Sequence, residues 1–359
     1  MGQHVISRVH EQCLLRHIPE DKGMFLDFFT VTSIVRLTSG IHCVLRLQYP
    51  TSTDMATSKR NKQTRKQLRQ SFTSPGQPGE ALADEHRRLM DTLRLPAFRT
   101  DLNGVLSEDQ RREVVSAAQL DGSEFCFIIP AFFRFIEHLH STGTSFNLVF
   151  RTFGDDLHRI AQEFNLFCEG RHPFFTMGST PMDGRDGGID RRIHLHGTQH
   201  GTFYRSDDET VLVMGTFRQP SEVETPIDEF YGDQPSVRFI RGLEGIYSQL
   251  SSAWRPQQAT LAIRDFYPYW FSKQEDASAG KLLAIDESDR DVHAVFFDDN
   301  ILSNEPHIVD ARNVRSNEEI PWSKAKELYL LRVEPLDAIA DEAYFISRLK
   351  QSLETKLAE

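Results

Sequence analysis

The sequence predicts an α/β fold: a parallel sheet between helical layers, with a β-rich insertion. From residue 125 onward, short apolar runs alternate with amphipathic stretches, which is the strand–helix rhythm of parallel sheets. Residues 170–240 break this rhythm with a Gly- and Asp-rich stretch and a hairpin pattern around Asp207 and Asp208. The composition, 39% hydrophobic with 26 Phe in 359 residues, is that of a globular protein with a sizeable core.

By composition and pattern, the chain divides into a tail, a first region with a basic insertion, and a core that is split by a β-rich cap. The expected bounds are 1–23 for the tail, 24–124 for the first region with its polar, basic insertion at about 48–80, 125–169 for the first part of the core, 170–240 for the cap and 241–359 for the second part of the core with a C-terminal helix. The insertion is rich in Ser, Thr, Pro and Gly, so we expect a mobile loop there.

Each element of the core is expected from an apolar run and its flanking residues. Strands are predicted at 146–152, 259–266, 293–299 and 307–312. Helices are predicted at 80–93, 130–143, 155–167, 242–254, 278–286 and 337–357. The segment at 201–217 is expected to form a β-hairpin.

Charge and cysteine content exclude several classes of protein. A formal net charge of −11 argues against nucleic-acid binding over the whole surface. The basic residues 58–70 could still contact a nucleic acid, which is a third hypothesis for the function, and a solvated linker is the plainer interpretation of this segment. The four Cys form no CxxC pair, which is typical of reduced thiols in a cytosolic protein. The sequence contains no run of 18 apolar residues, so it predicts no membrane span. We therefore expect a cytoplasmic protein.

Polar side chains lie at the expected ends of two strands and one helix. Asp298 and Asp299 end one strand, Arg151 and Thr152 end another, and Lys281 opens the helix expected at 278–286. In open parallel sheets, ligands bind beyond the carboxyl ends of strands. Adjacent carboxylates offer the hard oxygen ligands that suit Mg²⁺. The sequence predicts a Mg²⁺ site at the two Asp residues, and an Asp-Asn turn is the plainer interpretation.

The order of these residues resembles that of haloacid dehalogenase-like hydrolases. Members of that family carry a nucleophilic Asp after the first strand, then Thr or Ser, a Lys at a helix start, and one or two Asp after a later strand. Thr152, Lys281 and the pair Asp298-Asp299 match the second, third and fourth motifs in that order, over roughly half of the chain. The resemblance implies a Rossmann-like three-layer core with a cap. It also implies a Mg²⁺-dependent, phosphatase-type hydrolase that forms an aspartyl-phosphate on a small phosphorylated substrate.

Two segments fit the first motif of that family. "DLNGVL" offers Asp101, followed by Asn103 at the second acidic position, and its letters favour this choice. "MFLDFFTV" offers Asp27, followed by Phe29, and its better strand favours that choice. In phosphatases of the family the second Asp protonates the leaving group, which neither Asn nor Phe can do. The alternative function is therefore a catalytically impaired binding or regulatory protein on the same scaffold.

Three histidines lie close together in "RRIHLHGTQHGTFYR". His194 and His196 would share one face of a strand, and His200 follows four residues later. Imidazoles in this arrangement suit Zn²⁺, and beside several Arg they also suit an anionic substrate. A metal site, a substrate-binding role and a solvated polar hairpin all remain open for this segment.

Overall fold

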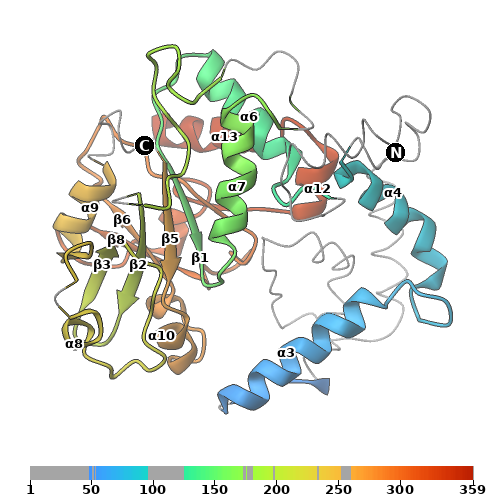
Figure 1. The fold of residues 1–359 in the computed structure, drawn as a ribbon, viewed down its shortest axis with the longest axis horizontal. Coiled ribbons are helices and arrows are strands. Elements are labelled where there is room, and N and C mark those ends of the chain that lie inside the picture. The colour runs from blue at the N-terminus through green and yellow to red at the C-terminus, as the bar shows by residue number, and fades with distance from the viewer. Residues whose placement is uncertain are drawn as a thin grey trace.

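A five-stranded sheet with strand order β1-β5-β2-β3-β4 forms the centre of the fold (Figure 1). The computed structural model describes residues 48–50, 52, 54–95, 125–172, 175, 181–196, 199–232, 234–251 and 260–358. Strands β1 (Leu148–Thr152), β5 (Thr260–Asp265) and β2 (His200–Arg205) run parallel, and β3 (Thr210–Met214) and β4 (Arg238–Arg241) continue the sheet antiparallel. The α/β class is confirmed, with a mixed sheet in place of the expected parallel one.

Two smaller parallel pairs accompany this sheet. One joins β6 (Lys281–Ile285) to β8 (Val309–Asn313), and the other joins β7 (Phe296–Asp298) to β9 (Leu330–Arg332). The helix expected at 278–286 is therefore wrong, because a short 3₁₀ turn (Ala277–Ala279) leads into a strand. Four apolar residues in a row, at 282–285, fit a buried strand as well as a helix, and pairing with β8 decides the outcome.

The hairpin predicted at 201–217 is confirmed as β2 and β3, with Phe203 opposite Leu212. Its first strand also pairs with β5, so His200 lies level with Ala262 and Phe203 with Asp265. The hairpin thus belongs to the same sheet as the core strand β1 instead of standing apart as a cap. The domain bounds at 170 and 240 stay a prediction.

Phenylalanine-rich helices cover one face of the sheet. Figure 1 shows α6 (Pro130–Ser141), α7 (Leu157–Cys168) and α13 (Tyr344–Ala358) grouped beside β1. Pro130 starts α6 in the first turn, where a missing N–H costs nothing. Many of the Phe residues form the main core here, among them Phe133, Phe135, Phe150, Phe164, Phe167 and Phe345.

A second helix packs against the other face of β5. α9 (Leu243–Ser251) contributes Ile246 to a cluster with Leu261 and Ile263, whereas their neighbour Ala262 belongs to the phenylalanine core. Successive residues of a strand point to opposite faces. Figure 1 also shows the smaller pair β6 and β8 on the side of α9, away from α4 (Ala83–Leu93). Four of the described helices are short: α8 (Ile227–Tyr231), α10 (Tyr267–Ser272), α11 (Trp322–Ala325) and α12 (Pro335–Ala340).

The basic insertion contains a helix where a mobile loop was expected. α3 (Met55–Gln70) carries Lys59, Arg60, Lys62 and Lys66, and its buried Arg65 donates to the Tyr49 carbonyl. Lys, Arg and Gln are good helix formers, and they outweigh the Ser and Thr content that suggested a loop. No helix among the described residues is long and apolar enough to cross a membrane.

A glycine before Lys281 allows β6 to approach β8 closely. A Cβ on Gly280 would lie 2.3 Å from the Ile308 carbonyl oxygen, which accepts the Lys281 N–H at 2.7 Å. We expect Gly280→Ala to lower the free energy of unfolding by about 1–3 kcal/mol, the usual effect of overpacking, measured as a shift of the urea midpoint. Gly245→Ala on α9 is the control, because its nearest neighbour lies 3.4 Å away. Equal midpoints for the two variants would contradict the close approach.

Candidate functional site

Four charged side chains meet where strands β1, β5, β6 and β7 begin or end. Arg151 donates through Nε to Asp265 Oδ2 at 3.0 Å and through a second nitrogen to the other oxygen. Lys281 Nζ lies 2.8 Å from Asp298 Oδ2. All four residues are buried, with exposed fractions of 2–8%. We call them the charged cluster.

Register explains why Arg151 and Asp265 face each other. Arg151 is level with Ile263 on β5, so it points to the same face as Ile263 and Asp265. Its guanidinium lies over the Phe203 ring at 4.5 Å and also donates to the Leu282 carbonyl of β6. This last bond brings the start of β6, and with it Lys281, to the sheet.

Aromatic rings surround the Lys281 ammonium. The Phe153 ring lies 5.5 Å and the Phe296 ring 5.9 Å from its Nζ. Burial by itself lowers the pKa of this ammonium, but the Asp298 and Asp265 carboxylates outweigh it, so the pKa is raised. Lys281 is therefore a buried cation at neutral pH, held in an environment where its charge acts strongly.

Asp298, Asp299 and Asn300 form a tight, buried turn. The Asn300 backbone N–H donates to Asp298 Oδ1 at 2.8 Å, and its side-chain amide donates to Asp298 Oδ1 and Asp299 Oδ1, each at 3.0 Å. The Asp-Asn turn that the sequence suggested is present. It also holds both carboxylates in place, with Asp298 between the Asn300 amide and the Lys281 ammonium.

Thr152 takes part in the turn that leads from β1 into α7. Its hydroxyl donates to Asp156 Oδ1 at 3.1 Å and accepts the Gly154 N–H at 2.8 Å. To hydrogen-bond a phosphoryl oxygen, the hydroxyl would have to exchange its bond to Asp156. Both nucleophile candidates, Asp27 and Asp101, lie outside the described residues, so their distance from Asp298 stays a prediction.

The histidine segment differs from its expected form. His194 and His196 lie before β2, so the expectation that they share one face of a strand is wrong. Their rings are nevertheless 5.5 Å apart. His194 Nε2 contacts Asp190 Oδ2 at 3.1 Å. His200 starts β2 and is buried, and the burial lowers its pKa. Level with Ala262, His200 points to the opposite face from Arg151.

Some residues of the site were missed in the sequence. Asp265 completes the charged cluster but stands at the start of the aromatic run "DFYPYWF", which gives no local sign of a charged site. Asp310 pairs with Arg312 and also with Arg205, the latter at 2.6 Å. A separate group of Cys126, Glu163 and His172 places three potential metal ligands together. Cys126 lies far from the other two residues in the sequence, so no local pattern indicates this group.

A surface depression lies at the other end of β6 from Lys281. It is small and is lined by Tyr247, Asp286, Tyr329 and Lys356, among others. Its acidic residues already have partners, since Asp286 pairs with Arg315 and Asp289 accepts from Tyr247. The depression is therefore separate from the charged cluster.

The contact between Lys281 and Asp298 can be tested as a buried ion pair. We expect Lys281→Met to lower the free energy of unfolding by about 3–5 kcal/mol, because it leaves a buried carboxylate without its cation. Adding Asp298→Asn should restore part of that loss. Urea midpoints of the two single variants and the double variant measure the coupling.

The exposed pair of Lys273 and Asp207, with Nζ 2.7 Å from Oδ1, is the matched control. Lys273→Met should leave the midpoint nearly unchanged, since solvent screens an exposed pair. Additive losses for Lys281→Met and Asp298→Asn would show that the buried pair is not coupled.

Comparisons with known proteins give no match for this chain. No family model matches it, and none of the curated proteins or solved structures does so.

Proposed function

We propose that this chain is a Mg²⁺-dependent hydrolase of the haloacid dehalogenase-like kind that acts on a phosphorylated small molecule. The observation that carries the proposal is the contact of Lys281 with Asp298 beside the pair of Arg151 and Asp265. Thr152, Lys281 and Asp298 follow one another in the order of the family's motifs. In support, Lys281 and Asp298 meet where β6 begins and β7 ends.

The roles follow from the chemistry of the groups. Asp298 and Asp299 would supply hard oxygen ligands to Mg²⁺, which neutralises a phosphoryl group together with Lys281. A carboxylate oxygen of Asp101, or of Asp27, would attack phosphorus while the alcohol leaves. Water would then hydrolyse the aspartyl-phosphate and release inorganic phosphate. Electrostatic stabilisation of the spread charge is the main contribution of the protein in such a reaction.

Charge balance favours this use of the Lys281–Asp298 pair. A doubly negative phosphate monoester and Mg²⁺ together bring no net charge into the buried cluster. Asp298 can then turn from Lys281 to the cation while Lys281 turns to the phosphoryl oxygens, so each buried charge exchanges one partner for another. Such an exchange avoids the large penalty of an unpaired buried charge.

The alternative is a binding or regulatory protein that keeps the metal and lacks turnover. It is favoured by Asn103, which stands after Asp101 where family phosphatases have their acid–base Asp, or by Phe29 after Asp27. Neither side chain can protonate a leaving group. Under this alternative Mg²⁺ and a phosphorylated ligand bind, but no phosphate is released.

Phosphate release from an aryl phosphate with Mg²⁺ tests the proposal. An aryl substrate is suitable because its leaving group needs little help from a general acid. We expect Mg²⁺-dependent turnover, lowered at least about 100-fold in Asp298→Asn because an electrostatic contact in the transition state is lost. The exposed Asp291, on the same stretch of chain, gives the control variant Asp291→Asn, which should keep full activity.

Two outcomes would decide against a hydrolase. Absence of metal-dependent phosphate release, with Mg²⁺ binding retained in calorimetry, would establish the binding alternative. Equal activity in Asp298→Asn and the wild type would remove the charged cluster from the reaction. Asp101→Asn and Asp27→Asn, assayed alongside, identify the nucleophile as the one whose loss abolishes turnover.

A further inference from the structure

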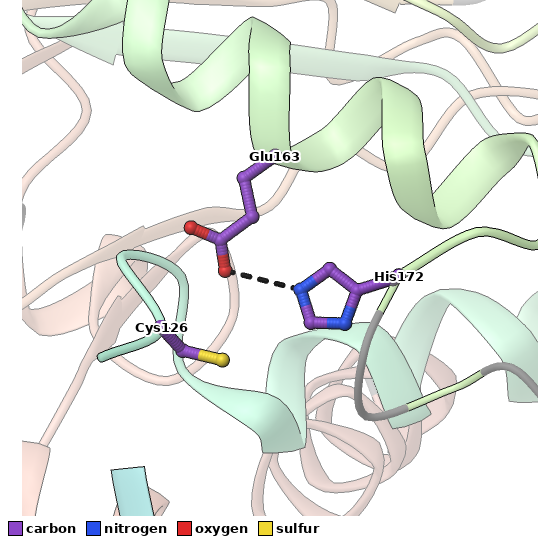
Figure 2. Close-up of side chains that lie close together, drawn as sticks. All are labelled: Cys126, Glu163 and His172. Atoms are coloured by element: carbon purple, nitrogen blue, oxygen red, sulfur yellow. Dashed lines mark hydrogen bonds and ion pairs between the residues drawn. The ribbon is translucent and has the colours of Figure 1, made fainter. Parts of the chain in front are cut away.

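Cys126, Glu163 and His172 form a buried group in the phenylalanine core. Figure 2 shows the three side chains converging from the turn before α6, from α7 and from the segment after α7. One potential ligand atom from each lies within 4.8 Å of the other two, and His172 Nε2 is 3.2 Å from Glu163 Oε1. The exposed fractions are at most 1%. We call these three residues the sulfur cluster.

The separations fit a tetrahedral metal ion. Bond lengths of about 2.0–2.2 Å to nitrogen and oxygen and about 2.3 Å to sulfur place neighbouring ligand atoms about 3.3–3.6 Å apart. The contact of His172 with Glu163 already has nearly this length. The remaining atoms would need to move together by about 1 Å at most, which side-chain rotation can provide.

Backbone groups hold the Glu163 carboxylate in position. The Phe127 N–H donates to Oε2 at 2.7 Å, and the Ile128 N–H donates to Oε1 at 3.3 Å. Outer hydrogen bonds of this kind orient the carboxylate ligands of metal sites. The His172 ring is fixed between Phe133, 4.6 Å away, and Phe175, 5.5 Å away. The sulfur cluster therefore has oriented ligands inside an apolar shell.

We propose that Cys126, Glu163 and His172 bind a transition-metal dication, with Zn²⁺ as the first candidate. A thiolate and an imidazole favour Zn²⁺ over Mg²⁺, which prefers oxygen ligands. Three protein ligands leave a fourth coordination position. The ion ties together α6, α7 and the segment after α7, so its role is to stabilise this part of the core. The proposal does not depend on the hydrolase activity proposed above.

Binding has a proton balance that can be measured. Burial and the nearby Glu163 carboxylate raise the pKa of the Cys126 thiol, so without metal it holds its proton. The metal takes the thiolate, and the thiol proton goes to solvent.

The experiment compares metal content and Co²⁺ spectra of matched cysteine variants of the full chain. After dialysis against micromolar Zn²⁺, the wild type should hold one ion per chain by mass spectrometry of the metal. Co²⁺ in its place should give the near-ultraviolet absorption of a thiolate ligand. Cys126→Ser should lose that absorption. Loss of an outer partner already costs about 10–100-fold in affinity, so Cys126→Ser should bind Zn²⁺ at least about 100-fold more weakly.

Cys168→Ser is the control, because Cys168 is also fully buried and lies on the same helix as Glu163, outside the sulfur cluster. It should keep both signals. His194→Asn with His196→Asn tests the other histidine segment and should also leave binding unchanged. Zn²⁺ bound equally by Cys126→Ser and the wild type, or no Zn²⁺ in the wild type, would overturn the proposal. If Cys126→Ser does not fold, the Co²⁺ spectrum of the wild type decides: no thiolate absorption overturns it.

Discussion

Two buried arginines hold the smaller strand pair against the main sheet, and the candidate site depends on them. Arg151 of β1 donates to the Leu282 carbonyl, and Arg205 of β2 donates to the Gly280 carbonyl. Each also pairs with a buried carboxylate, since a guanidinium removed from water needs several partners. These two carbonyls belong to the residues directly before and directly after Lys281 in the chain. The arginines therefore fix where the Lys281 ammonium enters the core, and so which carboxylate it meets.

The sequence predicts strands and helices well where pattern and length agree. The strands β1 and β5 and the helices α6 and α7 follow from apolar runs with clear start and stop residues. Prediction fails at β6, because its four apolar residues carry no period and only pairing with β8, 28 residues onward in register, makes them a strand. It also fails at α3, where helix-forming cations outweigh a loop-like composition. At β6 the deciding interaction comes from a distant strand, whereas at α3 the intrinsic helix propensity of the residues themselves decides.

The same distinction explains which site residues were found. Asp298 and Lys281 were found because they flank apolar runs, even though Lys281 was assigned to the wrong kind of element. Asp265 was missed because its neighbours are aromatic and its partner Arg151 lies 114 residues away. Glu163 looked like an ordinary helix residue, and the turn that carries Cys126 reaches it only through packing of α6 and α7. Long-range pairing of this kind leaves no mark on local sequence.

The charged cluster and the sulfur cluster differ in how a cation would enter them. At Asp298 the incoming ion meets a carboxylate that is already paired with Lys281, so binding exchanges charge partners and is helped by an anionic ligand. At Cys126 the incoming ion meets a protonated thiol in an apolar shell, so binding releases a proton and needs no anion. If both proposals hold, occupancy of the first site would follow the concentration of phosphorylated ligand, whereas occupancy of the second would not. The two sites can be filled separately in one chain, because hard oxygen ligands and a thiolate with an imidazole select different metals.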